Sequence, residues 1–273
     1  MTIPSAGLAV AGSLLFVPGD RPDRFGKAAA SGAGVVIVDL EDAVATADKD
    51  RARDHAADWL SGGNRAVVRI NPPGTPWSEA DIAMAAEYAC PVMIPKAESR
   101  AVVADVASQV TGPLILLVET ALGVEQASQL CATSSVVRAA FGNLDLSTAL
   151  GIDPTDRTAL LHSRSRLVIA SAAAGIAPPI DGVTTDIRNG AVLRADIEHA
   201  RRLGFTGKLC IHPAQLAAVD KGFRPSPQEE QWARTVLDAG ESATTVGGQM
   251  VDKPVLERAR RILAAARTPR STA

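Results

Sequence analysis

The chain has 273 residues, of which 47% are hydrophobic and 21% charged, so it can bury a large core as one domain. Its 28 basic and 30 acidic residues are scattered and give a formal net charge of -2, which predicts neither nucleic acid nor an anionic membrane as a partner. Three widely spaced cysteines without a CxxC motif argue against a disulfide framework and a thiolate metal site, and they fit a cytoplasmic protein.

The N-terminal run GLAVAGSLLFV is apolar enough to be compared with a signal-peptide core. No Lys or Arg precedes it, and it continues directly into PGDRPDRF, so we do not interpret it as a signal peptide. No run in the chain reaches the ~18 apolar residues that a membrane span requires. We therefore expect a soluble protein that acts on small molecules.

Eight short apolar runs, rich in β-branched residues, recur along the chain and predict strands. They are SLLFV (13–17), VVIVDL (35–40), AVVRIN (66–71), PVMIP (91–95), PLILLVET (113–120), VVRAAFG (136–142), PPIDGV (178–183) and GKLCIH (207–212). Ala-rich amphipathic segments between them, such as KDRARDHAADWL and RADIEHARRLG, are long enough for crossover helices. Eight such units predict an α/β fold, a (β/α)8 TIM barrel. The alternative is an open doubly wound sheet, but the first predicted strand is not followed by GxGxxG.

The strand–helix rhythm ends after residue 212. The segment PSPQEEQWARTVLDAGESA predicts a helix, the Gly-rich TTVGGQMVDKP follows it, and LERARRILAAA predicts a final helix. We therefore divide the chain into a TIM-barrel catalytic domain, residues 1–222, and a C-terminal helical extension, residues 223–273.

Polar side chains gather at the C-terminal ends of the predicted strands, where a (β/α)8 barrel builds its active site. The residues at the N-terminal ends of the same strands are mostly small and uncharged. Five carboxylates and two basic residues are expected to converge at this rim. The polar residues at the strand ends include Asp20, Arg21, Asp39, Glu41, Asp42, Arg69, Asn71, Lys96, Glu119, Asn143, Asp145, Asp181 and His212. So many carboxylates repel one another unless a cation lies among them, which predicts a hard divalent ion, Mg²⁺, with open positions for substrate.

Other site chemistries have little support in the sequence. There is no HExxH motif, GxSxG motif or Walker A loop, and the strand ends lack the two or three histidines of a zinc site. Only His212 ends a predicted strand, where a structural hydrogen bond is as plausible as a catalytic role. Arg69 suits two-point binding of a substrate carboxylate, and an ion pair with a neighbouring carboxylate is the alternative.

Seven motifs in order resemble one known family. LLFVPGDRPDRFGKA, VVIVDLEDAV, VVRIN, IPKAES, LLVET, LCIHPAQ and GGQMVDKP are similar to the citrate lyase beta subunit-like proteins of the HpcH/HpaI aldolase and citrate lyase family, which includes CoA ester lyases. The resemblance runs from about residue 13 to about residue 265. It implies a magnesium-carrying barrel, assembled as a homotrimer, that cleaves or forms a carbon–carbon bond next to a CoA thioester.

The resemblance also implies roles for individual residues. Glu119 of LLVET and Asp145 of FGNLDLS would be the direct metal ligands. Arg69 of VVRIN would bind the carboxylate of the 2-keto or 3-hydroxy acid. Asp252 of GGQMVDKP would reach the site of a neighbouring subunit, on which the C-terminal extension packs, and act there as general acid and base.

Five more residues are expected around these. Lys96, Arg21 and Arg24 would lie near the substrate or the CoA phosphates, as the resemblance implies. Two direct carboxylate ligands leave Mg²⁺ the positions it keeps for substrate and water. Glu41 and Asp42 are therefore expected to hold metal-bound waters, or to orient Arg69 or Lys96, without ligating the metal themselves.

One departure from the family pattern bears on the substrate. Many relatives carry two acids, GAEDL, where this chain has Gly142 to Leu146, GNLDL, so that Leu144 replaces the first acid. Asp145 corresponds to the second acid, and metal binding is expected to survive. The identity of the substrate is what the replacement puts in question.

The function expected is Mg²⁺-dependent cleavage or formation of a 3-hydroxyacyl-CoA thioester, such as citryl-CoA, malyl-CoA or citramalyl-CoA, with a 2-keto acid and an acyl-CoA as the other species. One alternative is a CoA-independent 2-keto acid aldolase, which uses a similar Glu and Asp pair 26 residues apart, as at positions 119 and 145. The other is a non-catalytic subunit of a lyase complex, because a fold alone does not guarantee an activity.

Overall fold

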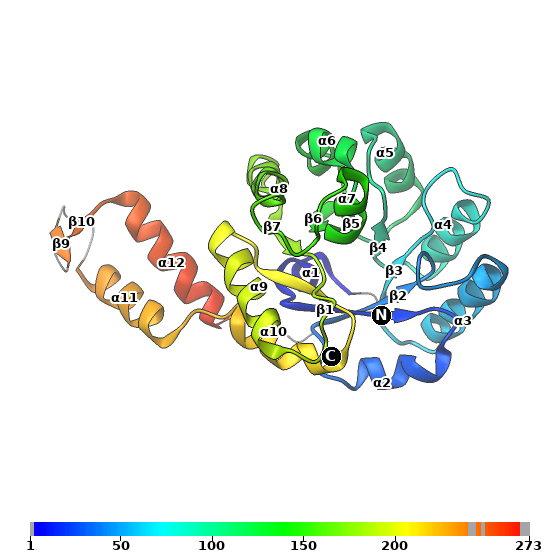
Figure 1. Cartoon of the computed structure of the whole chain (residues 1–273), viewed down its shortest axis with the longest axis horizontal. Coiled ribbons are helices and arrows are strands. Elements are labelled where there is room, and N and C mark those ends of the chain that lie inside the picture. Colours follow the sequence, from blue (N-terminus) through cyan, green and yellow to red (C-terminus); the bar gives the residue numbers. More distant parts are fainter. Residues whose placement is uncertain (1–2, 240–243, 247–248, 268–273) are drawn as a thin grey trace.

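The computed structural model describes residues 3–239, 244–246 and 249–267. Eight parallel strands form a closed barrel in chain order (Figure 1). They are β1 Ser13–Pro18, β2 Val35–Asp39, β3 Val67–Arg69, β4 Val92–Ile94, β5 Leu114–Val118, β6 Val136–Phe141, β7 Ala177–Asp181 and β8 Gly207–Cys210. The barrel closes where β1 pairs with β8, with Leu14 opposite Leu209. The predicted TIM barrel is confirmed, and each strand lies within two residues of its predicted run.

Helices surround the barrel and connect its strands (Figure 1). They are α2 Phe25–Ala29, α3 Lys49–Ser61, α4 Ser78–Glu87, α5 Arg100–Gln109, α6 Ala121–Cys131, α7 Asn143–Leu150, α8 Leu161–Ala173, α9 Gly190–Leu203 and α10 Leu216–Gly222. The short α7, between β6 and α8, was not predicted. No helix among the residues described above is long and apolar enough to cross a membrane.

Alternate residues of each strand face two different cores. On β2, Val36 and Val38 belong to the large core between the barrel and its helices, whereas Val35 and Ile37 belong to the core inside the barrel. The inward row of β5 includes Leu117. Because side chains alternate along a strand, the residue two positions after an inward apolar residue also points inward. At the C-terminal end of a strand, such a residue faces the mouth of the barrel, and its neighbours in sequence face the helices.

The opposite end of the barrel is closed by the N-terminal segment. Helix α1, Ser5–Val10, places Leu8 in the inner core together with barrel residues. Arg138 of β6 is fully buried, and its Nη1 donates to the carbonyl oxygens of Leu8 at 3.1 Å and Ala11 at 2.7 Å. The apolar N-terminal run therefore packs as part of the barrel, and the chemistry is confined to the other end.

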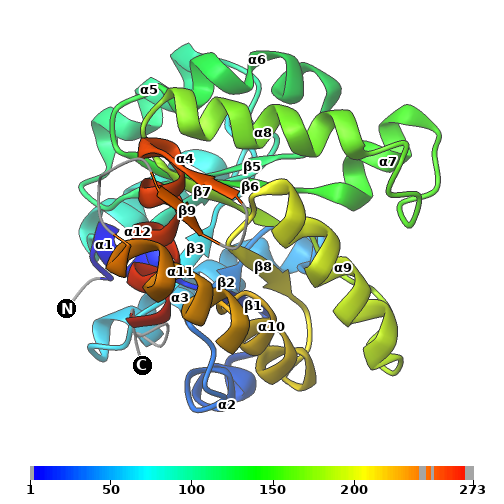
Figure 2. The ribbon, with the colours of Figure 1, turned by 90° about the vertical axis from the view of Figure 1, so that its left-hand side faces the viewer.

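The C-terminal part forms a structure of its own beside α9 and α10 (Figures 1 and 2). Helix α11, Pro227–Asp238, and helix α12, Lys253–Arg267, flank the strands β9, Thr244–Val246, and β10, Gln249–Val251. The two helices share a small core that includes Ala233, Val236, Leu256 and Ala259. Both helices were predicted, whereas the antiparallel pairing of β9 with β10 was not.

Candidate active site

A cavity of about 350 Å³ opens at the C-terminal ends of the strands. Its polar lining comes from four elements and the segments that follow them: Asp39, Asp42, Arg69, Glu119, Asn143 and Asp145. This is the end of a (β/α)8 barrel at which active sites are found. Of the charged residues predicted at the rim, five line this cavity, whereas Asp20, Arg21, Glu41, Lys96 and Asp181 do not.

Glu119 is a closely packed acid of the cavity. It follows inward-facing Leu117 by two residues, and it is only 3% exposed. Its Oε1 accepts a hydrogen bond from the backbone N–H of Lys96 at 2.9 Å, and Lys96 has a left-handed backbone with φ 48°. A Cβ on Gly142 would lie 2.3 Å from the Cβ of Glu119, so glycine is required beside this carboxylate. Such local strain and close packing are typical of functional sites.

Burial and neighbouring negative charge raise the pKa of Glu119. Loss of hydration is the largest cause, and the carboxylates of Glu41 and Asp145 add to it. The N–H of Lys96 and the charge of Arg69 act in the opposite direction, and the resulting pKa is about 8. A cation beside Glu119 would favour its ionised form, so the environment of this acid suits metal binding.

Asp145 reaches the same cavity from a helix. Gly142 is the N-cap of α7, and Asp145 lies in the first turn of this helix. A carboxylate is favourable there because the N-terminal end of a helix carries a partial positive charge. The loop from β6 to α7 thus places the second acid opposite the end of β5, and its charge acts on Glu119.

Asp39 and Arg69 form a buried two-point ion pair. Nε and Nη2 of Arg69 each lie 2.6 Å from a carboxylate oxygen of Asp39, and the guanidinium lies 4.8 Å from the ring centre of Phe16. Asp39 also accepts from the backbone N–H groups of Glu41 and Ala43, at 2.9 and 3.2 Å. These partners hold the pKa of Arg69 above its usual range, despite burial, and they fix the plane of its guanidinium.

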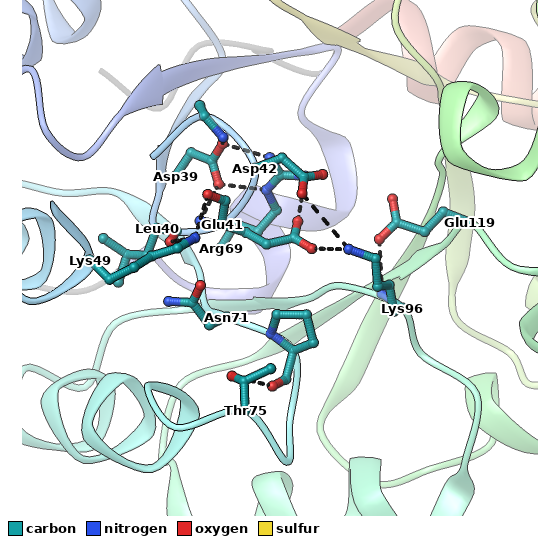
Figure 3. Close-up of polar contacts among 12 residues, drawn as sticks. Asp39, Leu40, Glu41, Asp42, Lys49, Arg69, Asn71, Thr75, Lys96 and Glu119 are labelled. Atoms are coloured by element: carbon teal, nitrogen blue, oxygen red, sulfur yellow. Dashed lines mark hydrogen bonds and ion pairs between the residues drawn. The ribbon is translucent and has the colours of Figure 1, made fainter. Parts of the chain in front are cut away.

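Glu41 and Asp42 extend this network to the next strands (Figure 3). Glu41 is buried, and its carboxylate oxygens lie 2.9 Å from Nη1 of Arg69 and 2.5 Å from Nζ of Lys96. Asp42 is exposed and lies farther away, at 3.9 Å from Arg69 and 3.8 Å from Lys96. Burial raises the pKa of Glu41, and the two cations oppose this shift. The alternative proposed for Arg69, an ion pair, is therefore present in the structure.

Lys49 is a residue of this network that the sequence analysis missed. It is buried, and its Nζ donates to the carbonyl oxygens of Leu40 at 2.8 Å and of Glu41 at 2.6 Å (Figure 3). Lys49 begins the buried stripe of α3 that continues with Ala52 and Ala56. A lysine at helical spacing on an otherwise apolar face was the signal that could have identified it.

Other predicted residues lie outside the cavity lining. Arg21 and Arg24 are exposed in the loop after β1, where Arg21 pairs with Asp23 at 3.1 Å. His212 is exposed and its Nδ1 accepts from the N–H of Ala214, a local structural hydrogen bond. Asp252 is exposed at the start of α12, where its Oδ1 accepts from the N–H of Val255 at 3.2 Å.

The residues of the cavity fit a divalent cation. The acids Asp39, Glu41, Asp42, Glu119 and Asp145 outnumber the bases Arg69, Lys96 and Lys49 by two. Within the described part of the chain, Oε2 of Glu119 has no hydrogen-bond partner, and no three His, Cys, Asp or Glu side chains are grouped so that they could hold a metal together. A cation held by two carboxylates keeps positions for water and substrate, as Mg²⁺ sites do.

Comparison with known proteins gives a consistent result. The chain is 41% identical over 259 residues to a citrate lyase subunit beta-like protein of Mycobacterium tuberculosis, covering 91% of this chain and 93% of that protein. It is 34% identical over 270 residues to a (3S)-malyl-CoA thioesterase of Cereibacter sphaeroides, covering 93% and 94%.

A solved structure shows the same similarity. The protein CitE from M. tuberculosis, in complex with magnesium, acetoacetate and coenzyme A, has a TM-score of 0.83 at 39% identity and covers 94% of this chain and 98% of that one. Other structures of CitE or the citrate lyase beta subunit from that organism contain magnesium with pyruvate or oxaloacetate. The model of the HpcH/HpaI aldolase/citrate lyase family matches residues 12–213. The chain belongs to the HpcH/HpaI aldolase/citrate lyase family.

Proposed function

We propose that the protein is a Mg²⁺-dependent carbon–carbon lyase that cleaves or forms a 3-hydroxyacyl-CoA thioester. One observation carries the proposal: Glu119, Asp145 and Arg69 line the same cavity at the mouth of the barrel. Two acids of this kind suit a metal, and a guanidinium suits the carboxylate of an oxyacid. The relatives in complex with magnesium, coenzyme A and keto acids support the same assignment.

Glu119 and Asp145 would hold the Mg²⁺. The bound ion would act as Lewis acid and template for the carboxylate and the hydroxyl or keto oxygen of the substrate. Glu41 and Asp42, within ion-pair distance of Arg69 and Lys96, keep these cations in place without taking part in the metal bond.

Arg69 would bind the substrate carboxylate. A guanidinium has five N–H groups. Nε and Nη2 of Arg69 each donate one to Asp39, and Nη1 lies 2.9 Å from a carboxylate oxygen of Glu41. Nη1 and Nη2 therefore each retain one N–H. Because Asp39 fixes the guanidinium plane on one side, these groups are held in position before the substrate arrives.

In the cleavage direction, a base removes the proton of the substrate hydroxyl. The O–H electron pair forms the new C=O bond, the adjacent C–C bond breaks, and its electron pair becomes the thioester enolate, which takes a proton to give the acyl-CoA. We propose Asp252 of a neighbouring subunit as this acid and base. Its exposure on the C-terminal extension, apart from its own cavity lining, supports a role at another copy's site within a homotrimer.

The CoA portion would approach from the rim. Arg21 and Arg24 are exposed in the loop that follows β1, at the same end of the barrel as the cavity. Guanidinium groups suit phosphate, so these two residues are proposed to bind the CoA phosphates. Lys96, whose side chain is 39% exposed, is proposed to contact the substrate through its ammonium while it remains paired with Glu41.

The test is a turnover assay with purified protein and Mg²⁺. The substrates are a panel of 3-hydroxyacyl-CoA thioesters and free hydroxy-keto acids, and 2-keto acid release is followed with and without EDTA. EDTA-sensitive release from thioesters alone is expected. Release from the free acids instead indicates a CoA-independent aldolase, and no turnover of any substrate indicates a non-catalytic subunit.

A further inference from the structure

The cavity is lined by charged and by apolar side chains, which we call the charged part and the apolar part. The charged part comes from the ends of β2, β3 and β5 and from the first turn of α7. The apolar part consists of Phe16, Ala43, Leu117, Phe141, Leu144, Val183, Leu209 and Ile211. The two parts meet at the acids, because Leu144 directly precedes Asp145 and Leu117 lies one inward position below Glu119.

Two residues of the apolar part are unusually exposed. Leu144 is 37% exposed and Ile211 is 42% exposed, and both border the cavity. They come from different elements, the first turn of α7 and the end of β8. Large apolar side chains gain free energy when a ligand covers them, at about 25 cal/mol per Å². This side of the cavity is therefore suited to an apolar substituent.

Arg69, Lys96 and Lys208, the cations in or near the cavity, each have a carboxylate partner. Arg69 is the only basic residue in the described lining, and it lies in the charged part. The ammonium of Lys96 is paired with Glu41, and Lys208 is buried with its Nζ 2.7 Å from Asp181. A second substrate carboxylate that faced Leu144, Leu209 and Ile211 would lose its hydration and meet no basic residue among them, which is costly.

We infer that the substrate carries a short alkyl group, and not a carboxymethyl group, on the carbon that bears the hydroxyl. This inference rests on the proposed function. The carbon–carbon bond cleaved is the same, and the 2-keto acid released has one carboxylate, as pyruvate and 2-oxobutyrate do, in place of the two of oxaloacetate. The related tuberculosis proteins have been solved with pyruvate and with oxaloacetate, so family membership leaves this choice open.

The first test compares kcat/KM for two thioesters that differ at this carbon. Citramalyl-CoA carries a methyl group there, and citryl-CoA carries a carboxymethyl group. We expect the methyl compound to be preferred by at least about tenfold, because the cavity offers apolar contact and no partner for the extra charge. Equal values, or a preference for citryl-CoA, overturn the inference.

A substitution then tests whether the apolar wall is the cause. Ile211→Arg is expected to shift the ratio of kcat/KM toward citryl-CoA by about tenfold, whereas Ile211→Met, which keeps the wall apolar, leaves the ratio near that of the native protein. Leu150→Arg is the matched control, since Leu150 is an exposed residue of α7 outside the cavity lining. An unchanged ratio in Ile211→Arg, or an equal shift in Leu150→Arg, contradicts the assignment.

A binding measurement separates this inference from the proposed function. Calorimetric titration of the Mg²⁺-loaded protein with 2-oxobutyrate and with freshly prepared oxaloacetate needs no turnover. Tighter binding of 2-oxobutyrate supports the apolar subsite even if no thioester is cleaved, in which case the proposed function alone fails. Tighter or equal binding of oxaloacetate contradicts the subsite, whatever the activity.

Discussion

Two buried charge networks lie at the same end of the barrel, and they differ in how their charges are balanced. On the outer side of β7 and β8, Asp181 accepts from Nε of Arg164 at 2.9 Å and from Nζ of Lys208 at 2.7 Å. Lys208 also donates to the carbonyl oxygen of Gly182 at 2.6 Å. These cations lower the pKa of Asp181 although the group is buried. Inside the cavity the acids are in excess, and the pKa of Glu119 is raised to about 8.

The comparison distinguishes charges that have fixed partners within the protein from charges that are left for a ligand. The outer network gives its one carboxylate two fixed cations. The cavity network gives Arg69 and Lys96 fixed partners but leaves the charge of Glu119 and Asp145 without a fixed counterpart. Perturbed carboxyl groups of the second kind mark functional sites, because the missing charge is supplied by a ligand.

The largest expected effect comes from removing a carboxylate of the cavity. Asp145→Asn takes away one of the two proposed metal ligands, and we expect Mg²⁺ affinity to fall by more than about 100-fold, the upper range for loss of a supporting residue, with activity reduced to background. Calorimetric Mg²⁺ titration measures this directly. Asp54→Asn, at an exposed position of α3, is the control and should bind Mg²⁺ normally. Native affinity in Asp145→Asn would remove this residue from the metal site.

Breaking the outer network should change stability and leave catalysis intact. Lys208→Met removes one cation from Asp181 and leaves the buried carboxylate with Arg164 alone. Loss of one partner of a buried pair costs about 3–5 kcal/mol, so the midpoint of urea denaturation should fall accordingly. KM and kcat of the remaining folded protein should stay near native values. A large change in KM at native stability would show that the outer network also acts on the site.

Glu119→Gln tests how the cavity network makes the stability of the metal-free protein depend on pH. The pKa of this carboxyl rises from 4.5 in the unfolded chain to about 8 in the folded one, so the folded state binds the additional proton between these values. Its contribution to stability is therefore fully present below about pH 4.5 and lost as pH rises through about 8. Replacement by Gln should remove this loss, which is on the order of a few kcal/mol.

Urea denaturation in EDTA at pH 5 and pH 8.5 measures this effect. The Gln variant should be the more stable protein at the higher pH only, and Mg²⁺ should stabilise the native protein alone. Glu125→Gln, at an exposed position of α6, serves as the control. Identical pH slopes for the native protein and Glu119→Gln would contradict the raised pKa. Asp181 should behave in the opposite way, since its lowered pKa contributes stability that is lost as pH falls below 3.8.

The smallest effect is expected at Lys49, the buried lysine of the cavity network. Its acceptors are the neutral carbonyl groups of Leu40 and Glu41, so Lys49→Met leaves no carboxylate without a partner. We expect a loss of about 1–3 kcal/mol in unfolding free energy and a few-fold rise in KM, because the segment that carries Glu41 and Asp42 loosens. Equal destabilisation by Lys49→Met and Lys208→Met would remove the distinction between the two networks.

Most of the barrel could be predicted because its strands are apolar on both faces. Runs such as VVIVDL and PLILLVET are buried on each side of the sheet, so they stand out from the amphipathic helices that follow. Helix α7 and the β9–β10 pairing were missed, since neither has a long periodic pattern. The division at residue 222 and the packing of the extension on a neighbouring subunit remain predictions.

The sequence predicted which residues lie at the candidate site, but not which of them contact one another. The position of charged residues at strand ends indicated Glu119, Asp145 and Arg69 as members of one rim. Which side of the strand each residue faces depends on parity, and this separates inward Asp39 from Asp181, which contacts helix α8 through Arg164. The partners of Glu41 and Lys49 lie on other elements, and sequence spacing carries no information about them. The roles proposed for Asp252, Arg21 and Arg24 remain to be tested.

Closure of the barrel also has a consequence for how the protein is made. Strand β1 pairs with β2 on one side and with β8 on the other, and β8 is the last barrel strand to be synthesised. Until then one edge of β1 lacks its partner, and exposed edges of this kind promote association between chains. A nascent chain should therefore benefit from a chaperone that shields β1, and a circular permutant that brings β8 next to β1 in sequence should refold faster.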